Sequence, residues 1–429
     1  MIKKKTTVII LERIVLGLLA LILVLRLIIY RALTSPDIQD AAGLMNAISE
    51  GDGIIALLSL VAGIILIFKL TLKKEPFRRT TVDIPILLFF SACAFSLFGS
   101  VEKGMTITGI KMLCVNLVVF YALRNCLNSF HRRRFFIMFL LGLALAAAVL
   151  GIYEYFFIYG NIDASNMPAF IARIIELRRV GSFFDWPNLL AGFLALMIPV
   201  CVGAFFAQKK NVDRLIMALA AAALFTAMFF TSSILCWVSF IAIGAVFSFL
   251  FMVRRMKEKK ISLLIAYMTI IALSLTVLAV IIAKRIDPFS AASLQSRIGY
   301  LRVAFAAITG NPLTGTGFDT FGIVSSRFAA SSGGISAYAH NSFLQVWVET
   351  GIAGFAGFLW LSLSSIRYGI LNIGKIEARE ERVLFAGLVW GITAFISDNL
   401  FNMTALYAHT SIYWWACLGI IFSWKRNEP

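Results

Sequence analysis

Long runs of apolar residues, separated by short polar and basic connections, repeat along the whole chain. A helix that crosses the hydrocarbon core of a membrane needs about 20 mostly apolar residues. Twelve segments approach or exceed this length: residues 8–30, 53–70, 84–98, 105–123, 135–158, 188–206, 215–231, 234–253, 261–283, 341–366, 383–400 and 405–424. The pattern predicts an all-α fold, a polytopic integral membrane protein with about 12 transmembrane helices. Residues 1–429 are expected to form a single transmembrane domain.

Composition agrees with this pattern. Hydrophobic residues make up 60% of the chain and charged residues only 14%, with a mean hydropathy of +0.89. A water-soluble domain of this length has no core large enough to bury so much apolar surface, so the soluble globular class is excluded. The six cysteines are scattered without metal-ligand spacing and are expected to be packing residues.

Basic residues gather in alternate connections. The segments are "KLTLKKEPFRR", "HRRR", "AQKK", "RRMKEKK" and "KIEAREER". Because Lys and Arg are retained in cytoplasmic loops, these segments place both termini in the cytoplasm. The first apolar stretch is long and lacks a small-residue cleavage site, which favours a retained anchor over a removed signal peptide. Topology and attraction to the membrane surface therefore account for the net charge of +17, and no nucleic-acid partner is expected.

Two predicted external loops are long and rich in basic residues, against the topology rule. Residues 159–187 form the first loop and residues 284–340 the second, large one. In the second, "LQSRIGYLRVAFAAIT" places Ile298, Leu301, Phe305 and Ile308 at helical spacing, which predicts an amphipathic helix on the membrane surface. The turn residues of "GNPLTGTGF" then end this helix. Both loops are expected to cover the bundle and shape a site.

Three blocks of these loops resemble one family. They are "RRVGSFFDWPNLLAGFLAL", "SRIGYLRVAFAAITGNPLTGTGFDTF" and "AHNSFLQVWVETGIAGFAGFL". Together, in this order, they are similar to the O-antigen ligase and polysaccharide polymerase superfamily, whose members are membrane enzymes that move glycans from undecaprenyl-diphosphate carriers. The resemblance departs from the family pattern at Asp185-Trp186 and at Leu301.

The resemblance implies a catalytic histidine, His340, that takes the proton of the acceptor hydroxyl, without a metal or other cofactor and with inversion at the anomeric carbon. It also implies that Arg178 and Arg297 clamp the diphosphate, with Arg179 and Arg302 as neighbours. The chemistry agrees, because guanidinium groups match phosphate geometry and imidazole titrates near neutrality. The alternative is that the arginines anchor helices to lipid headgroups and that His340 caps a helix.

Further polar residues are candidates for contact with the substrate: Asn341, Asp185, Asn188 and Glu349. At 100° per residue, His340 and Glu349 lie on opposite faces of a helix, whereas Ser342, Gln345 and Glu349 share one polar face. This face is expected either to line the site or to bond a neighbouring helix. Gly351, Gly354 and Gly357 are expected to permit close helix packing.

The predicted reaction is transfer of a glycan from an undecaprenyl-diphosphate donor to an acceptor hydroxyl. If the acceptor is lipid A-core the enzyme is an O-antigen ligase, and if it is a growing polysaccharide it is a polymerase. The resemblance implies the bacterial inner membrane, with the active site facing the periplasm and the lipid bilayer as surroundings. The alternative from another class is a transporter or flippase of lipid-linked glycans, which the number of spans would also suit.

Overall fold

The described part of the chain is built from helices. The computed structural model describes residues 2–33, 41–73, 79–162, 169–184, 186–255, 269, 276, 288–327, 336 and 338–424, and these contain no β-strand. The helices are α1 (Ile2–Leu33), α2 (Ala41–Lys73), α3 (Asp83–Phe95), α4 (Lys103–Cys126), α5 (Phe130–Tyr153), α6 (Ala169–Glu176), α7 (Pro187–Ala207), α8 (Asn211–Thr231), α9 (Ile234–Arg255), α11 (Pro288–Gly310), α12 (Phe321–Arg327), α14 (Ser342–Ile373), α15 (Arg379–Asp398) and α16 (Ala408–Ser423). A π-helical turn, Glu154–Ile158, extends α5.

The predicted apolar segments correspond to these helices. Segment 261–283 lies almost entirely outside the described residues, and each of the other segments has a helix at its position. Within the described ranges, seven helices are long and apolar enough to cross a membrane, and the apolar helices α3 and Ile234–Phe249 are shorter. The all-helical class is confirmed, and the count of about 12 spans stays a prediction.

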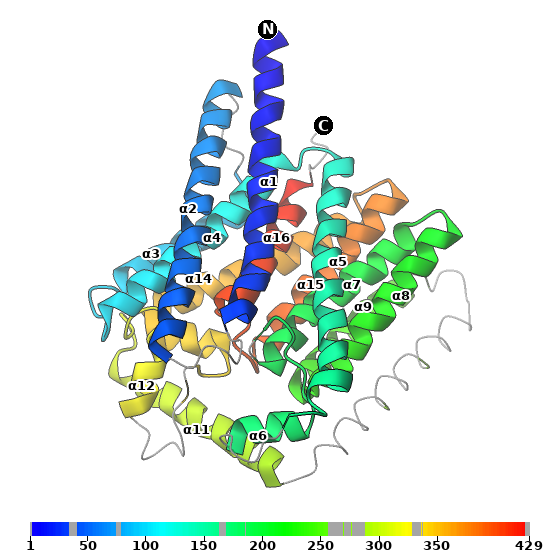
Figure 1. Cartoon of the computed structure of the whole chain (residues 1–429). Helices are drawn as coiled ribbons and strands as arrows, with labels where there is room; N and C mark the ends of the chain where they lie inside the picture. Colours follow the sequence, from blue (N-terminus) through cyan, green and yellow to red (C-terminus); the bar gives the residue numbers. More distant parts are fainter. Residues whose placement is uncertain are drawn as a thin grey trace.

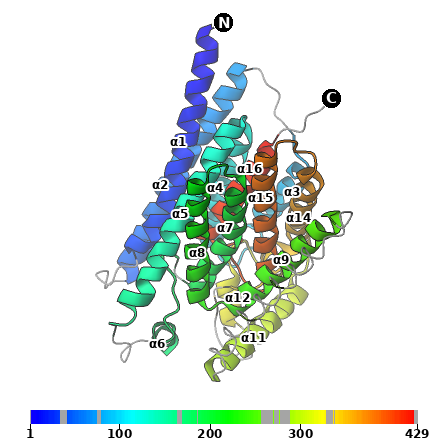
Figure 2. The ribbon, with the colours of Figure 1, turned by 90° about the vertical axis from the view of Figure 1, so that its right-hand side faces the viewer.

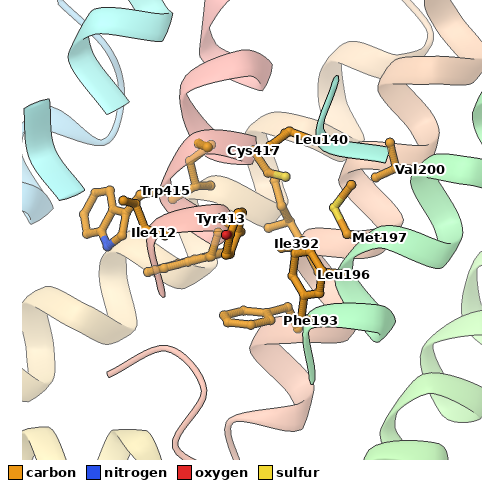
Figure 3. Packing of buried hydrophobic residues seen from close by; sticks show 14 of the residues in the cluster. Leu140, Phe193, Leu196, Met197, Val200, Ile392, Ile412, Tyr413, Trp415 and Cys417 are labelled. Carbon is orange, nitrogen blue, oxygen red and sulfur yellow. The ribbon is translucent and has the colours of Figure 1, made fainter. Parts of the chain in front are cut away.

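The centre of the bundle is formed by α7, α15 and α16. Glycines let α7 and α15 touch backbone to backbone: a Cβ atom at Gly391 would lie 2.1 Å from the Leu196 carbonyl oxygen, and one at Gly203 would lie 2.6 Å from that of Val383. Aromatic and aliphatic side chains fill the space between α7 and α16, where the rings of Phe193 and Tyr413 are 4.7 Å apart (Figure 3). This packed centre is a rigid support for the loops at its ends.

Both long loops lie at one end of the bundle. Helices α6, α11 and α12 gather there, whereas the two termini lie at the opposite end (Figures 1 and 2). The arrangement agrees with the expectation that the two loops share one side of the membrane.

One face of α11 packs against the rest of the protein. Val303, Ala304, Ala307 and Ile308 are the residues that α11 buries, in a cluster with residues of α12 and α14. Ile298 and Phe305, two of the four apolar residues at helical spacing, are 45% and 56% exposed. The position of α11 on the membrane surface stays a prediction.

Candidate functional site

His340 lies on the short segment that enters α14. Its φ angle is +52°, a left-handed conformation that a non-glycine residue adopts at some cost. Both neighbours are held: the Ala339 amide donates to Gln345 Oε1 at 3.0 Å, and Asn341 Oδ1 caps α14 by accepting from the Leu344 amide at 3.0 Å. Asn341, predicted to contact substrate, thus has a structural task, and it fixes the position of His340.

The imidazole of His340 is half-buried against α11. Its ring stacks on Tyr300 with centroids 5.7 Å apart, and its Nδ1 atom is buried with no hydrogen-bond partner among the described residues. Burial, and next the positive charge of Arg297, lower the pKa of His340 to about 3. The ring is therefore neutral at physiological pH and has a nitrogen able to accept a proton.

Arg297 extends from α11 toward the turn after α15. Its Nη1 donates to the Phe401 carbonyl oxygen at 2.7 Å, which orients the guanidinium beside His340. Arg302, one and a half turns further along α11, is exposed. The structure thus brings together His340 and Arg297, two residues that the sequence had singled out.

The first loop holds two adjacent arginines in different surroundings. Arg178 is exposed, has a φ angle of +47° and places its guanidinium 5.9 Å from the centroid of the Tyr155 ring. Arg179 is buried and donates to the Thr231 carbonyl oxygen and to Asn188 Oδ1, each at 3.0 Å. Arg179 and Asn188, both predicted to contact substrate, thus contact each other and tie the loop to α7 and α8.

Glu154 is a loop-holding residue that the sequence reasoning missed. It lies in the π-helical turn, is buried, and accepts a hydrogen bond from the Ser182 amide at 2.7 Å. A carboxylate within the apolar segment 135–158 was the available signal. Asp185, another predicted site residue, lies outside the described residues.

Glu349 fastens the second loop to α14. It is buried, and its carboxylate accepts from the amides of Asp319 and Phe321 at 3.0 and 3.1 Å and from Gln345 Nε2 at 3.0 Å. The other member of the predicted polar face, Ser342, donates to Asn399 Oδ1 at 2.7 Å. The face therefore bonds neighbouring segments, and two of its members, Gln345 and Glu349, also line a cavity.

The glycine turn of the second loop inserts into a break in α14. Gly351 has a φ angle of +68°, which interrupts the helix and frees backbone groups. The loop pairs with them: the amides of Thr316 and Gly317 donate to the carbonyl oxygens of Val348 and Glu349, each at 2.9 Å. Gly315 and Gly317 have positive φ angles, as turn residues do. Gly357 packs against the α3 backbone, in agreement with the predicted close helix packing. Gly351 instead adopts the positive φ angle that breaks α14.

A cavity of about 220 Å³ lies between the second loop and helices α2, α4, α14 and α16. Gln345 and Glu349 line it, together with Asp319 and Tyr338, which the sequence reasoning did not select. Tyr338 is two residues before His340, so the segment that carries His340 also forms a wall of the cavity. Among the described residues, no group of three His, Cys, Asp or Glu side chains is placed to hold a metal ion.

These features define a class: a multi-pass helical membrane protein whose buried polar network supports a histidine and arginines at the end of the bundle opposite its termini. Residues 219–359 match the family model described as O-Antigen ligase, which supports the O-antigen ligase and polysaccharide polymerase superfamily of glycosyltransferase-like membrane enzymes. The matched segment includes Arg297, Asp319, His340 and Glu349. No curated protein matches the chain.

Proposed function

We propose that the protein transfers an oligosaccharide or polysaccharide from an undecaprenyl-diphosphate donor to an acceptor hydroxyl. The observation that carries the proposal is the pairing of a neutral His340 with Arg297, because this reaction needs a base and a cation side by side. Both residues lie in the segment that matches the O-Antigen ligase family. We propose lipid A-core as the acceptor, which makes the protein a ligase, and a growing polysaccharide, which would make it a polymerase, is the alternative.

In the proposed reaction, the acceptor oxygen attacks the anomeric carbon of the donor sugar. The bond from this carbon to the diphosphate oxygen breaks, and undecaprenyl diphosphate leaves with the electron pair. The proton of the acceptor hydroxyl passes to the imidazole of His340. Arg297 and Arg178 bind the diphosphate and stabilise the charge that develops on it, and Arg302 adds positive charge on the same helix as Arg297.

Four other predicted site residues hold the loops in place. Arg179 and Asn188 hold the first loop so that Arg178 stays exposed, and Asn341 and Glu349 hold the segments on either side of the site. We infer the bacterial inner membrane as location, with both termini in the cytoplasm and the site facing the periplasm, because the termini lie at the end opposite the two loops (Figure 1).

The test is transfer by purified protein supplied with lipid-diphosphate glycan and candidate acceptors. His340→Ala is expected to lower the rate about 10²–10⁴-fold, the usual contribution of a general base. Arg297→Ala is expected to abolish detectable transfer. His131→Ala and Arg382→Ala are matched controls, because both residues are exposed and lie in the first turns of α5 and α15, outside both long loops. Normal turnover by either site variant contradicts the role of that residue, and absence of product from the unchanged protein contradicts the proposal.

A further inference from the structure

The cavity adjoins the segment that carries His340, because Tyr338 forms part of its wall, and the acidic residues that line it can be examined one by one. Arg26, which is buried, forms an ion pair with Asp52 and also donates to the Ala408 carbonyl oxygen at 3.2 Å. The carboxylate of Glu349 accepts three hydrogen bonds from protein groups. Asp52 and Glu349 therefore already have partners within the protein.

Asp319 is different, because its carboxylate lines the cavity and no group of the described residues donates a hydrogen bond to it. Its backbone is held in the left-handed region, with a φ angle of +66°, and its amide is bound to Glu349. Its Cβ also packs so closely on α4 that a Cβ atom at Gly109 would lie 2.8 Å away. A strained, fixed carboxylate without a partner is a common feature of a binding site.

The rest of the wall combines aromatic rings with neutral polar groups. Tyr338 and Tyr407 meet edge to face, 5.7 Å between centroids, and both line the cavity beside Trp414. On the facing wall, Asn116 Nδ2 donates to Ser411 Oγ at 3.1 Å. Aromatic faces contact the C–H faces of a sugar ring, and carboxylate and amide groups bond its hydroxyls. Among the described residues that line the cavity there is no Lys or Arg, so an anionic phosphate would find no cationic side chain in its wall.

Size and position narrow the ligand further. Drug-sized ligands occupy pockets of roughly 300–1,000 Å³, and this cavity of about 220 Å³ is smaller. It therefore suits one sugar ring at the end of a glycan and not a lipid-linked chain. Tyr338 forms its wall, while His340, two residues later, stacks on Tyr300 of α11 beside Arg297. The cavity and the cationic group thus adjoin the same short segment.

We propose that this cavity binds a single neutral sugar ring of the acceptor glycan, with Asp319 accepting hydrogen bonds from its hydroxyls. The assignment of this sugar to the acceptor rests on the proposed function, but sugar binding itself does not require transfer. It assigns the acceptor sugar and the donor diphosphate to neighbouring places, which the segment from Tyr338 to His340 connects.

The experiment measures sugar binding without donor. Saturation-transfer NMR is recorded on the purified protein with the methyl glycosides of glucose, galactose and N-acetylglucosamine as probes. At least one glycoside is expected to bind, and Asp319→Asn, which keeps the shape of the side chain and suits a left-handed backbone, is expected to weaken binding about tenfold or more. Thr108→Trp, at an exposed position of the cavity wall, is expected to abolish binding. Asp213→Asn, at the start of α8, is the matched control and should bind as the unchanged protein does.

His340→Ala separates the two proposals, because it should lose transfer and keep glycoside binding. Glycoside binding by a protein that transfers nothing would contradict the proposed function and support the cavity assignment. The cavity assignment would be overturned, whether or not transfer occurs, if no glycoside bound. It would also be overturned if Asp319→Asn and Thr108→Trp bound the glycoside as well as the unchanged protein does. Displacement of the glycoside by inorganic pyrophosphate would also overturn it, because the cavity would then hold the diphosphate.

Discussion

At the scale of single residues, adjacent side chains of one type have separate tasks. Arg178 is exposed over Tyr155, whereas Arg179 is buried with two hydrogen bonds to protein groups. A clamp for a diphosphate needs a guanidinium that a ligand can reach, and a buried guanidinium that already donates to protein oxygens serves the fold. The pKa of His340 is lowered by burial and by the charge of Arg297.

Substitution of Arg178 should affect activity, and substitution of Arg179 should affect stability. Arg178→Ala is expected to abolish transfer and to change the free energy of unfolding by less than about 0.5 kcal/mol, because the side chain is exposed. Arg179→Ala is expected to lower it by about 2–3 kcal/mol, since two oxygens lose a charged donor. Thermal unfolding in detergent and initial transfer rates measure the two effects. A stable Arg179→Ala variant, or an active Arg178→Ala variant, would contradict this division.

If His340 is the base, the transfer rate should depend on pH in a characteristic way. A base acts only when unprotonated, and with a pKa of about 3 the free enzyme keeps its base well below pH 6.5, so the acid limb of kcat/KM should lie far below that pH. A bound diphosphate brings negative charge that offsets the charge of Arg297 and raises the pKa. The acid limb of kcat should therefore lie at higher pH than that of kcat/KM. Initial rates from pH 4 to 8 test this order, and the reverse order would exclude His340 as the titrating base.

At the scale of elements, the break in α14 couples a helix to a loop. The loop from Pro312 to Gly317 satisfies the backbone groups that the break at Gly351 frees, and Glu349 then holds the residues that follow. Freed backbone groups at membrane depth are costly unless protein groups bind them. The same contacts fix the loop on which Asp319 lies and the helix that His340 precedes.

Gly351→Ala should therefore be strongly destabilising. An alanine Cβ would lie 2.0 Å from the Leu313 carbonyl oxygen, and its φ angle of +68° adds about 1–3 kcal/mol of strain. The thermal unfolding midpoint and the transfer rate are expected to fall together. Gly374→Ala, at the C-cap of the same helix, is the control, since its Cβ would meet no atom within 4 Å and its φ angle is −72°. Equal stability of the two variants would show that the break tolerates a side chain.

At the scale of the whole molecule, the bundle separates the two long loops from the termini. The long loops with α6, α11 and α12 lie at one end, and both termini lie at the other (Figure 2). Near the termini, basic side chains meet acidic partners, as in the ion pair of Lys209 with Glu380 at 2.7 Å. A lipid-linked substrate could reach the loop end only from one side of the membrane.

Thiol labelling tests this orientation. Thr309→Cys on α11 and Lys209→Cys between α7 and α8 are exposed positions at the two ends, studied with Cys114, an exposed cysteine, replaced by alanine. A membrane-impermeant maleimide added to intact spheroplasts should label position 309 at once and position 209 only after permeabilisation. Labelling in the opposite order would place the loop end in the cytoplasm and remove the basis for a periplasmic site.

The sequence by itself determined the class and the positions of the helices, because hydropathy over about 20 residues is a local property. It also singled out His340 and Arg297, whose motifs lie within continuous segments. Only the tertiary structure decided which face of α11 is buried, that Phe401 orients Arg297, and that Glu349 binds the loop. Asp319, Asn116 and Ser411 are far apart in the chain and meet at one cavity through helix packing, which no local pattern records.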